Sequence, residues 1–220
     1  MLELISFMVL ALVLGFKHSY DADHLIAVSN ILHKAKSIKS SVKVGLSWAL
    51  GHMLTATIIT ILIYNFKESV LGVILPHFKK IVGAMLIVLG FLSLRQFFVF
   101  HSHRHSHGNI VHSHQHIHLK HEHDGHFHRH MLGIGIIHGL ASNDELILLF
   151  TASLAVTSIG GLLIGLSIFS LGVVLGMILF TCLFSYPLLK THSELIHKII
   201  IFFTGSTGII YGILMAFSFV

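Results

Sequence analysis

GFKHSYDADH, residues 15–24, begins at the end of an apolar run that carries no charge from residue 4 to residue 16. Those thirteen residues would extend only about 20 Å as a helix, at ~1.5 Å per residue, whereas the hydrocarbon core is about 30 Å thick. A helix that crosses a membrane here must continue through four ionisable side chains: His18, Asp21, Asp23 and His24. Each costs at least about 2.5 kcal/mol inside a bilayer unless it is paired, hydrated or coordinated. Since these side chains are also good ligands for divalent transition metals, the segment predicts a metal site within the membrane.

The composition is typical of a multi-pass membrane protein. Of the 220 residues, 54% are hydrophobic and 10% are charged, and the mean hydropathy is +0.86, whereas a soluble domain carries about 25% charged residues. No basic region precedes the first apolar run, so we expect no cleaved signal peptide. One cysteine, Cys182, excludes a disulfide framework and a thiolate zinc site. We therefore expect a protein of the plasma membrane that does not bind nucleic acid.

The apolar runs predict six membrane helices, at residues 2–28, 42–65, 80–100, 131–156, 159–187 and 196–219. We expect the apolar stretch 70–75, just before Pro76, to be re-entrant or interfacial. Eleven basic residues lie in or beside the odd-numbered connections, against three in the even-numbered ones. This asymmetry predicts that the odd connections are cytoplasmic and that both termini lie outside.

Residues 101–130 hold 13 of the 21 histidines. Such a low-complexity tract cannot bury a core, and we expect a cytoplasmic loop that is disordered without metal. Near neutral pH its imidazoles are largely neutral and available as ligands. A passive spacer and an expression tag are the alternatives, but the interrupted, internal pattern disfavours a tag. The chain is thereby divided into residues 1–100, the His-rich loop 101–130, and residues 131–220.

Short patterns recur at a nearly constant shift between these two halves. Gly15-x-x-His18 recurs as Gly135-x-x-His138, and Gly45-Leu46-Ser47 recurs as Gly165-Leu166-Ser167, both at a shift of 120. The pair Gly83 and Gly90 recurs as Gly205 and Gly212, at a shift of 122. Each half has three predicted helices, an odd number, so the halves must have opposite orientations. We therefore predict an all-α membrane fold of two inverted three-helix repeats, with a site between them.

On an ideal helix, His18, Asp21 and His24 share one face within an arc of about 120°, and Asp23 lies off it. We expect Asp23 to bind through a local distortion or to orient a ligand from behind. Two imidazoles with one or two carboxylates suit nickel, cobalt or zinc better than sodium or magnesium. In the alternative interpretation, the aspartates cap the helix and one pairs with Lys17, which leaves the two histidines unexplained.

Two further helices carry candidate ligands. His52 follows Gly51 on a narrow, weakly polar surface and either bonds to a neighbouring helix or serves the ion. In the fourth helix, His138 matches His18 at the shift of 120, and Asp144 and Glu145 follow it. These two carboxylates require metal, protons, water or a pairing with Lys17 across the bundle.

The pattern His18-x-x-x-x-Asp23-His24 resembles the HX4DH signature of the nickel/cobalt transporter (NiCoT) superfamily. Leu50-Gly51-His52 resembles the second motif of that superfamily, and residues 135–145 resemble its later acidic motif more loosely. The resemblance implies transport of Ni²⁺ or Co²⁺, with His18, Asp23, His24 and His52 essential. Uptake members are described with eight helices, and the His-rich loop resembles that of the efflux branch, so the direction of transport stays open.

We therefore predict a secondary transporter or permease for Ni²⁺ or Co²⁺, and no enzyme. Its partners are the ion and the lipid membrane, with a cytoplasmic metal acceptor as a candidate. The alternatives are a zinc or other divalent-metal transporter or efflux protein, a metal store, and an intramembrane metalloenzyme, although the chain lacks H-E-x-x-H. The predicted metal ligands are His18, Asp21, Asp23, His24, His52, His138, Asp144 and Glu145.

Overall fold

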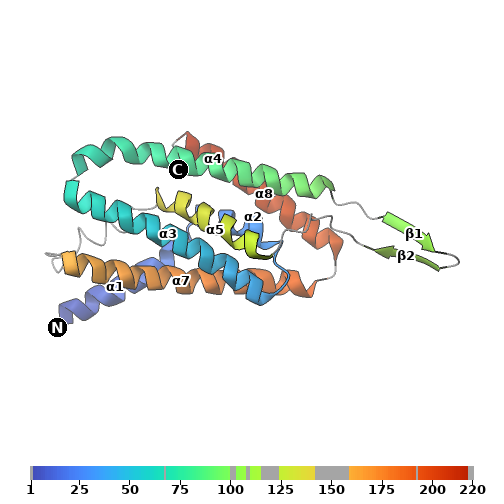
Figure 1. Cartoon of the computed structure of the whole chain (residues 1–220), viewed down its shortest axis with the longest axis horizontal. Helices are drawn as coiled ribbons and strands as arrows, with labels where there is room; N and C mark the ends of the chain where they lie inside the picture. The colour runs from blue at the N-terminus through green and yellow to red at the C-terminus, as the bar shows by residue number, and fades with distance from the viewer. Residues whose placement is uncertain are drawn as a thin grey trace.

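The computed structural model describes residues 2–66, 68–99, 103–107, 110–114, 124–141, 159–191 and 193–217. Within these residues the chain forms seven helices and one two-stranded sheet (Figure 1). The elements are α1 (Leu2–His18), α2 (Ala22–Leu32), α3 (Ile38–Phe66), α4 (Glu68–Val99), β1 (His103–His107), β2 (Ile110–His114), α5 (Asp124–Gly139), α7 (Ile159–Lys190) and α8 (Glu194–Ala216).

Four spans in the described part of the chain are long and apolar enough to cross a membrane: Ile38–Leu62, His77–Arg95, Gly160–Lys190 and Glu194–Ala216. The pair α1 and α2 is a fifth if its two bent helices form one span. Large apolar side chains such as Leu54, Phe91 and Phe203 point outward on these helices, as expected for a surface that faces lipid. The chain is therefore a helical, multi-pass membrane protein, as the composition predicts.

The prediction of one continuous helix over residues 2–28 is wrong. Helix α1 ends at His18, α2 begins at Ala22, and the two axes differ by 53°. At the break the backbone bonds tighten to three-residue spacing, since Tyr20 N–H donates to the Lys17 carbonyl and Asp21 N–H to the His18 carbonyl. Asp21 then takes the extended conformation of an N-cap residue, which restarts the helix in a new direction.

Two other boundaries also differ from the prediction. Only residue 67 separates α3 from α4, so residues 70–75 supply the first turns of α4 and form no separate re-entrant or interfacial piece. An apolar run that leads directly into a helix is accommodated by extending that helix. The predicted helix 131–156 begins earlier, at Asp124, and is described only to Gly139, because residues 142–158 lie outside the described part of the chain.

Part of the His-rich tract is ordered as a hairpin, contrary to the prediction of disorder. Strands β1 and β2 are antiparallel, with His103 opposite His114 and His105 opposite His112. Because histidine recurs at every second position in both strands, the tract has the period of a strand, and pairing satisfies its backbone polar groups without a core. The hairpin projects beyond one end of the helical bundle (Figure 1).

Helices distant in sequence pack in pairs: α1 against α7, α3 against α5, and α4 against α8. Glycine permits the closest approaches, since a Cβ at Gly15 would overlap the Phe169 carbonyl and one at Gly135 would overlap the Trp48 carbonyl. The link between α2 and α3, the hairpin, and the link between α7 and α8 lie at one end of the bundle, and the N-terminus lies at the other (Figure 1). The packing places the α1–α2 break against α3 and α7 in the interior.

Candidate metal centre

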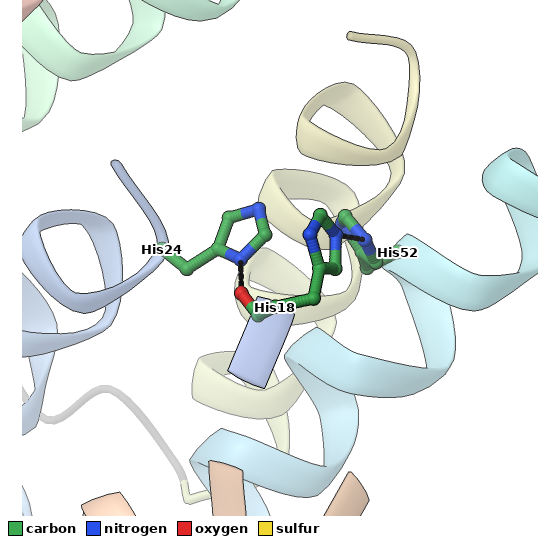
Figure 2. Close-up of side chains that lie close together, drawn as sticks. All are labelled: His18, His24 and His52. Atoms are coloured by element: carbon green, nitrogen blue, oxygen red, sulfur yellow. Dashed lines mark hydrogen bonds between the residues drawn. The ribbon is translucent and has the colours of Figure 1, made fainter. Parts of the chain in front are cut away.

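The break between α1 and α2 brings His18 and His24 together. His18 is the last residue of α1, and His24 is the third residue of α2. The Nδ1–H group of His24 donates to the carbonyl oxygen of His18 at 2.9 Å (Figure 2). Both side chains are buried. The hydrogen bond leaves the second ring nitrogen of His24, Nε2, available as a ligand atom.

His52 approaches His18 from α3. The two Nε2 atoms lie 3.3 Å apart, and His52 has no exposed surface. Figure 2 marks the contact between the two rings with a dashed line. On the same helix the indole of Trp48 stacks on the His52 ring, with centroids 4.8 Å apart and planes 17° from parallel. Trp48 also contacts the ring of His24, so one aromatic side chain forms a wall against two of the imidazoles.

His138 reaches the same place from α5, and Asp23 lies beside it. The Oδ2 atom of Asp23 is 3.5 Å from Nε2 of His138 and 3.7 Å from Nε2 of His24. Asp23 is 7% exposed and His138 is fully buried. The carboxylate therefore lies between two imidazoles in a site closed to solvent, where its negative charge requires a nearby proton or cation.

Two groups of three side chains have the geometry to hold a metal ion: His18 with His24 and His52, and Asp23 with His24 and His138. In each group the ligand atoms lie within 4.8 Å of one another, and every member is buried. Imidazole nitrogen with carboxylate oxygen suits divalent transition metals. The structure thus gathers five of the predicted site residues, from α1, α2, α3 and α5.

Asp21 lies beside the cluster and belongs to neither group. Its Oδ2 atom is 2.9 Å from Nδ1 of His18, and its Oδ1 atom is 3.6 Å from the exposed ammonium of Lys17. The Asp21 carboxylate therefore contacts both the His18 ring and Lys17. Asp144 and Glu145, the remaining predicted ligands, lie outside the described residues, and their roles stay predictions.

Sequence reasoning missed Trp48, which contacts His24, His52 and His138. The signal was available, because the chain has one tryptophan and it stands four residues before His52, on the same side of the helix. The expected common face of His18, Asp21 and His24 does not form, since the helix that would carry it is broken.

Comparison with known proteins identifies a relative that matches over nearly the whole chain. The chain is 34% identical, over 212 residues, to the protein named urease accessory protein UreH from Bacillus sp. (strain TB-90), and the match covers 96% of the chain and 90% of the relative. No family model and no solved structure matches the chain. The extent of this match agrees with the resemblance carried by His18, Asp23 and His24, and the chain belongs to the family of UreH, within the nickel/cobalt transporter superfamily.

Proposed function

We propose that the chain is a secondary transporter or permease for Ni²⁺ or Co²⁺ and that the ion passes through the buried cluster. The observation that carries the proposal is the convergence of four imidazoles and one carboxylate from four helices inside a membrane protein. Ionisable groups at such depth are expensive and mark ion paths more often than packing. The cluster members are His18, Asp23, His24, His52 and His138.

The chemistry of the cluster favours a divalent transition metal, among which we choose nickel or cobalt. Imidazole is a borderline ligand that suits nickel, copper, zinc and iron, whereas a site of oxygen atoms alone would suit magnesium or calcium. The single cysteine, Cys182, is in neither group, which removes the thiolate that favours copper(I). Membership of the nickel/cobalt superfamily and the urease-related name of the relative support the same choice.

Glycine contacts support the inverted-repeat architecture. A Cβ at Gly51 would overlap the carbonyl of Leu132, and a Cβ at Gly172 would overlap the carbonyl of Leu12. Leu12 and Leu132 differ by 132 − 12 = 120 positions, and Gly51 and Gly172 by 172 − 51 = 121. The α3–α5 contact therefore repeats as the α7–α1 contact with the partners exchanged, as a two-fold pseudosymmetry requires.

The third helices of the two halves follow the same rule. A Cβ at Gly83 would lie 2.7 Å from the carbonyl oxygen of Gly212, and one at Gly90 would lie 2.5 Å from that of Gly205. At the shift of 122, Gly83 corresponds to Gly205 and Gly90 corresponds to Gly212. The pair Gly83 and Gly212 therefore becomes the pair Gly205 and Gly90 when the two halves are exchanged. These contacts support a division into residues 1–100 and 131–220, joined by the His-rich loop.

The contacts also favour a shift of 121 positions between α3 and α7, the second helices of the two halves. The repeated glycine-leucine-serine pattern predicts a shift of 120 there. At 121, Leu50-Gly51-His52 corresponds to Leu171-Gly172-Val173. The second half therefore has valine where the first half has His52, and His138 where the first half has His18. The transport site is asymmetric although the scaffold repeats.

We place the chain in the plasma membrane, with the end that carries the hairpin in the cytoplasm, where a metal acceptor has access to it. Moving two positive charges inward across 100 mV releases about 4.6 kcal/mol, so the membrane potential alone is sufficient to drive uptake. No P-loop is present in the sequence to supply ATP hydrolysis.

Flux of radioactive nickel into proteoliposomes tests the function. The wild-type protein should admit nickel faster than protein-free liposomes, and His24→Ala should abolish the difference. His197→Ala is the matched control, because His197 lies on α8 and bonds to the Ser193 carbonyl, away from the cluster. Wild-type flux equal to that of empty liposomes would refute transport, and flux of zinc in place of nickel and cobalt would refute the choice of metal.

A further inference from the structure

We propose that the cluster consists of two mutually exclusive metal sites that share His24, so that one ion at a time passes between them by ligand exchange. The inference rests on the proposed transport function. We call His18, His24 and His52 the imidazole set, and Asp23, His24 and His138 the carboxylate set. Each set has two ligands of its own, and the two sets share His24.

The hydrogen bond of His24 makes the sets exclusive. Its Nδ1 is 2.9 Å from the His18 carbonyl oxygen, which can only accept, so Nδ1 carries the proton. A neutral imidazole then has a single lone pair, at Nε2. Since one lone pair cannot bind two ions, filling either set removes a ligand from the other.

His18 lies between a carboxylate and a second imidazole. Its Nδ1 is 2.9 Å from Oδ2 of Asp21, and its Nε2 faces Nε2 of His52 at 3.3 Å. His18 therefore offers Nε2 on the side of the imidazole set.

Among the described residues the buried Nδ1 of His52 has no hydrogen-bond partner. One of the two rings supplies the proton of the hydrogen bond between Nε2 of His18 and Nε2 of His52. A metal ion that binds both Nε2 atoms must displace that proton, so in the imidazole set it competes with an existing hydrogen bond. The imidazole set is therefore the weaker of the two.

The carboxylate set has the opposite character. Asp23 adds a full negative charge to two imidazoles, and its Oδ2 already lies within 3.7 Å of both. Coulomb attraction for a dication is strong in a buried site. The ion should therefore rest in the carboxylate set and occupy the imidazole set in passing.

The two sets also differ in their positions in the fold. The imidazole set comes from α1, α2 and α3, all in residues 2–66, whereas the carboxylate set joins α2 to His138 of α5, which follows the His-rich tract. His24 follows the bend between α1 and α2, at the point where the two sets meet. Exchange at His24 therefore transfers the ion from a site within the first half to a site between the halves.

Nickel binding to the full-length chain in detergent tests the proposal, in a background where the histidines of residues 101–130 are serine. The wild-type cluster should bind one Ni²⁺ per chain. His52→Ala and Asp23→Asn each leave one set complete, so each variant should still bind one ion, with Asp23→Asn weakened at least about tenfold and His52→Ala weakened less. His24→Ala and the double variant His52→Ala, Asp23→Asn should bind none.

X-ray absorption gives an independent readout, because nickel in Asp23→Asn should show the imidazole-rich coordination of the other set. His197→Ala, on α8, should match the wild type in both measurements. Two tightly bound ions per wild-type chain would overturn exclusivity, and loss of all binding in His52→Ala would overturn the two-set arrangement.

If the binding pattern holds but proteoliposome flux is absent, transport fails while the two sets stand. Nickel flux together with two bound ions would uphold transport and overturn the exclusive sets.

Discussion

The Nε2 atoms of His18 and His52 face each other at 3.3 Å, although the two residues are 34 positions apart in the chain. Two lone pairs cannot point at one another at this distance without a proton or a cation between them. The pair is thus a place where a metal ion can replace a proton. It forms because α1 ends at His18 and meets α3 at His52 inside the bundle.

Trp48 should report the arrival of nickel in the cluster. It is the only tryptophan of the chain and stacks on His52 at 4.8 Å, so a paramagnetic ion bound there should quench its fluorescence. Titration with Ni²⁺ should give saturable quenching in the wild-type protein and none in His24→Ala. Equal quenching in both proteins would place the quenching ion elsewhere, for example on the His-rich tract.

Asp21→Ala should weaken nickel binding about 10–100-fold without changing the number of ions bound, because it removes the carboxylate that lies 2.9 Å from Nδ1 of His18. Isothermal titration of the protein in detergent measures both quantities. Lys17→Ala is the control, since its ion pair with Asp21 is largely exposed and such pairs contribute about 1 kcal/mol or less. Loss of one bound ion in Asp21→Ala would make Asp21 a ligand instead.

Two neighbouring glycines of α5 should differ sharply when changed to alanine. A Cβ at Gly135 would overlap the Trp48 carbonyl, so Gly135→Ala should destabilise the protein by about 1–3 kcal/mol and lower nickel flux. At Gly133 a Cβ meets no other atom within 4 Å, so Gly133→Ala should be neutral or should stabilise by up to about 1 kcal/mol. Thermal unfolding in detergent measures the pair, and equal effects would contradict the α3–α5 packing.

Replacing residues 103–114 by a short Gly-Ser linker should reduce the number of metal ions bound per chain and leave nickel flux measurable. The hairpin projects from the end of the bundle (Figure 1), whereas the residues of the cluster are buried. Proteoliposome flux and metal analysis of the same preparation measure both effects. Complete loss of flux in well-folded protein would make the hairpin part of the ion path.

Single cysteines should label from opposite sides of the membrane at the two ends of the bundle. After Cys182→Ala, Lys36→Cys lies in the link between α2 and α3, and Glu3→Cys lies at the start of α1, and both positions are exposed. An impermeant reagent added outside should modify Glu3→Cys only, and a permeant reagent should modify both. Labelling of both positions by the impermeant reagent would refute the assigned topology.

The membrane class and the candidate ligands could be predicted from the sequence because both depend on local chemistry. An apolar run interrupted by His18, Asp23 and His24 is anomalous wherever the helix lies, and so is His52 or His138 in its own helix. The structure gathers all five residues into one cluster. The same reasoning predicts Asp144 and Glu145, which lie outside the described residues and stay predictions.

The arrangement of those candidate ligands depends on packing, which no local pattern encodes. An ideal helix places Asp23 off the binding face, but the bend of 53° after His18 turns α2 so that Asp23 lies between His24 and His138. The same bend leaves Asp21 beside Nδ1 of His18. The close approach of α5 to α3 at Gly135 and Gly139 decides which imidazole rings face one another. This contact joins segments that are more than 80 residues apart in the chain. Side-chain type and spacing identify a group that can bind a metal, but only the close packing of separate helices places its ligand atoms within reach of one ion.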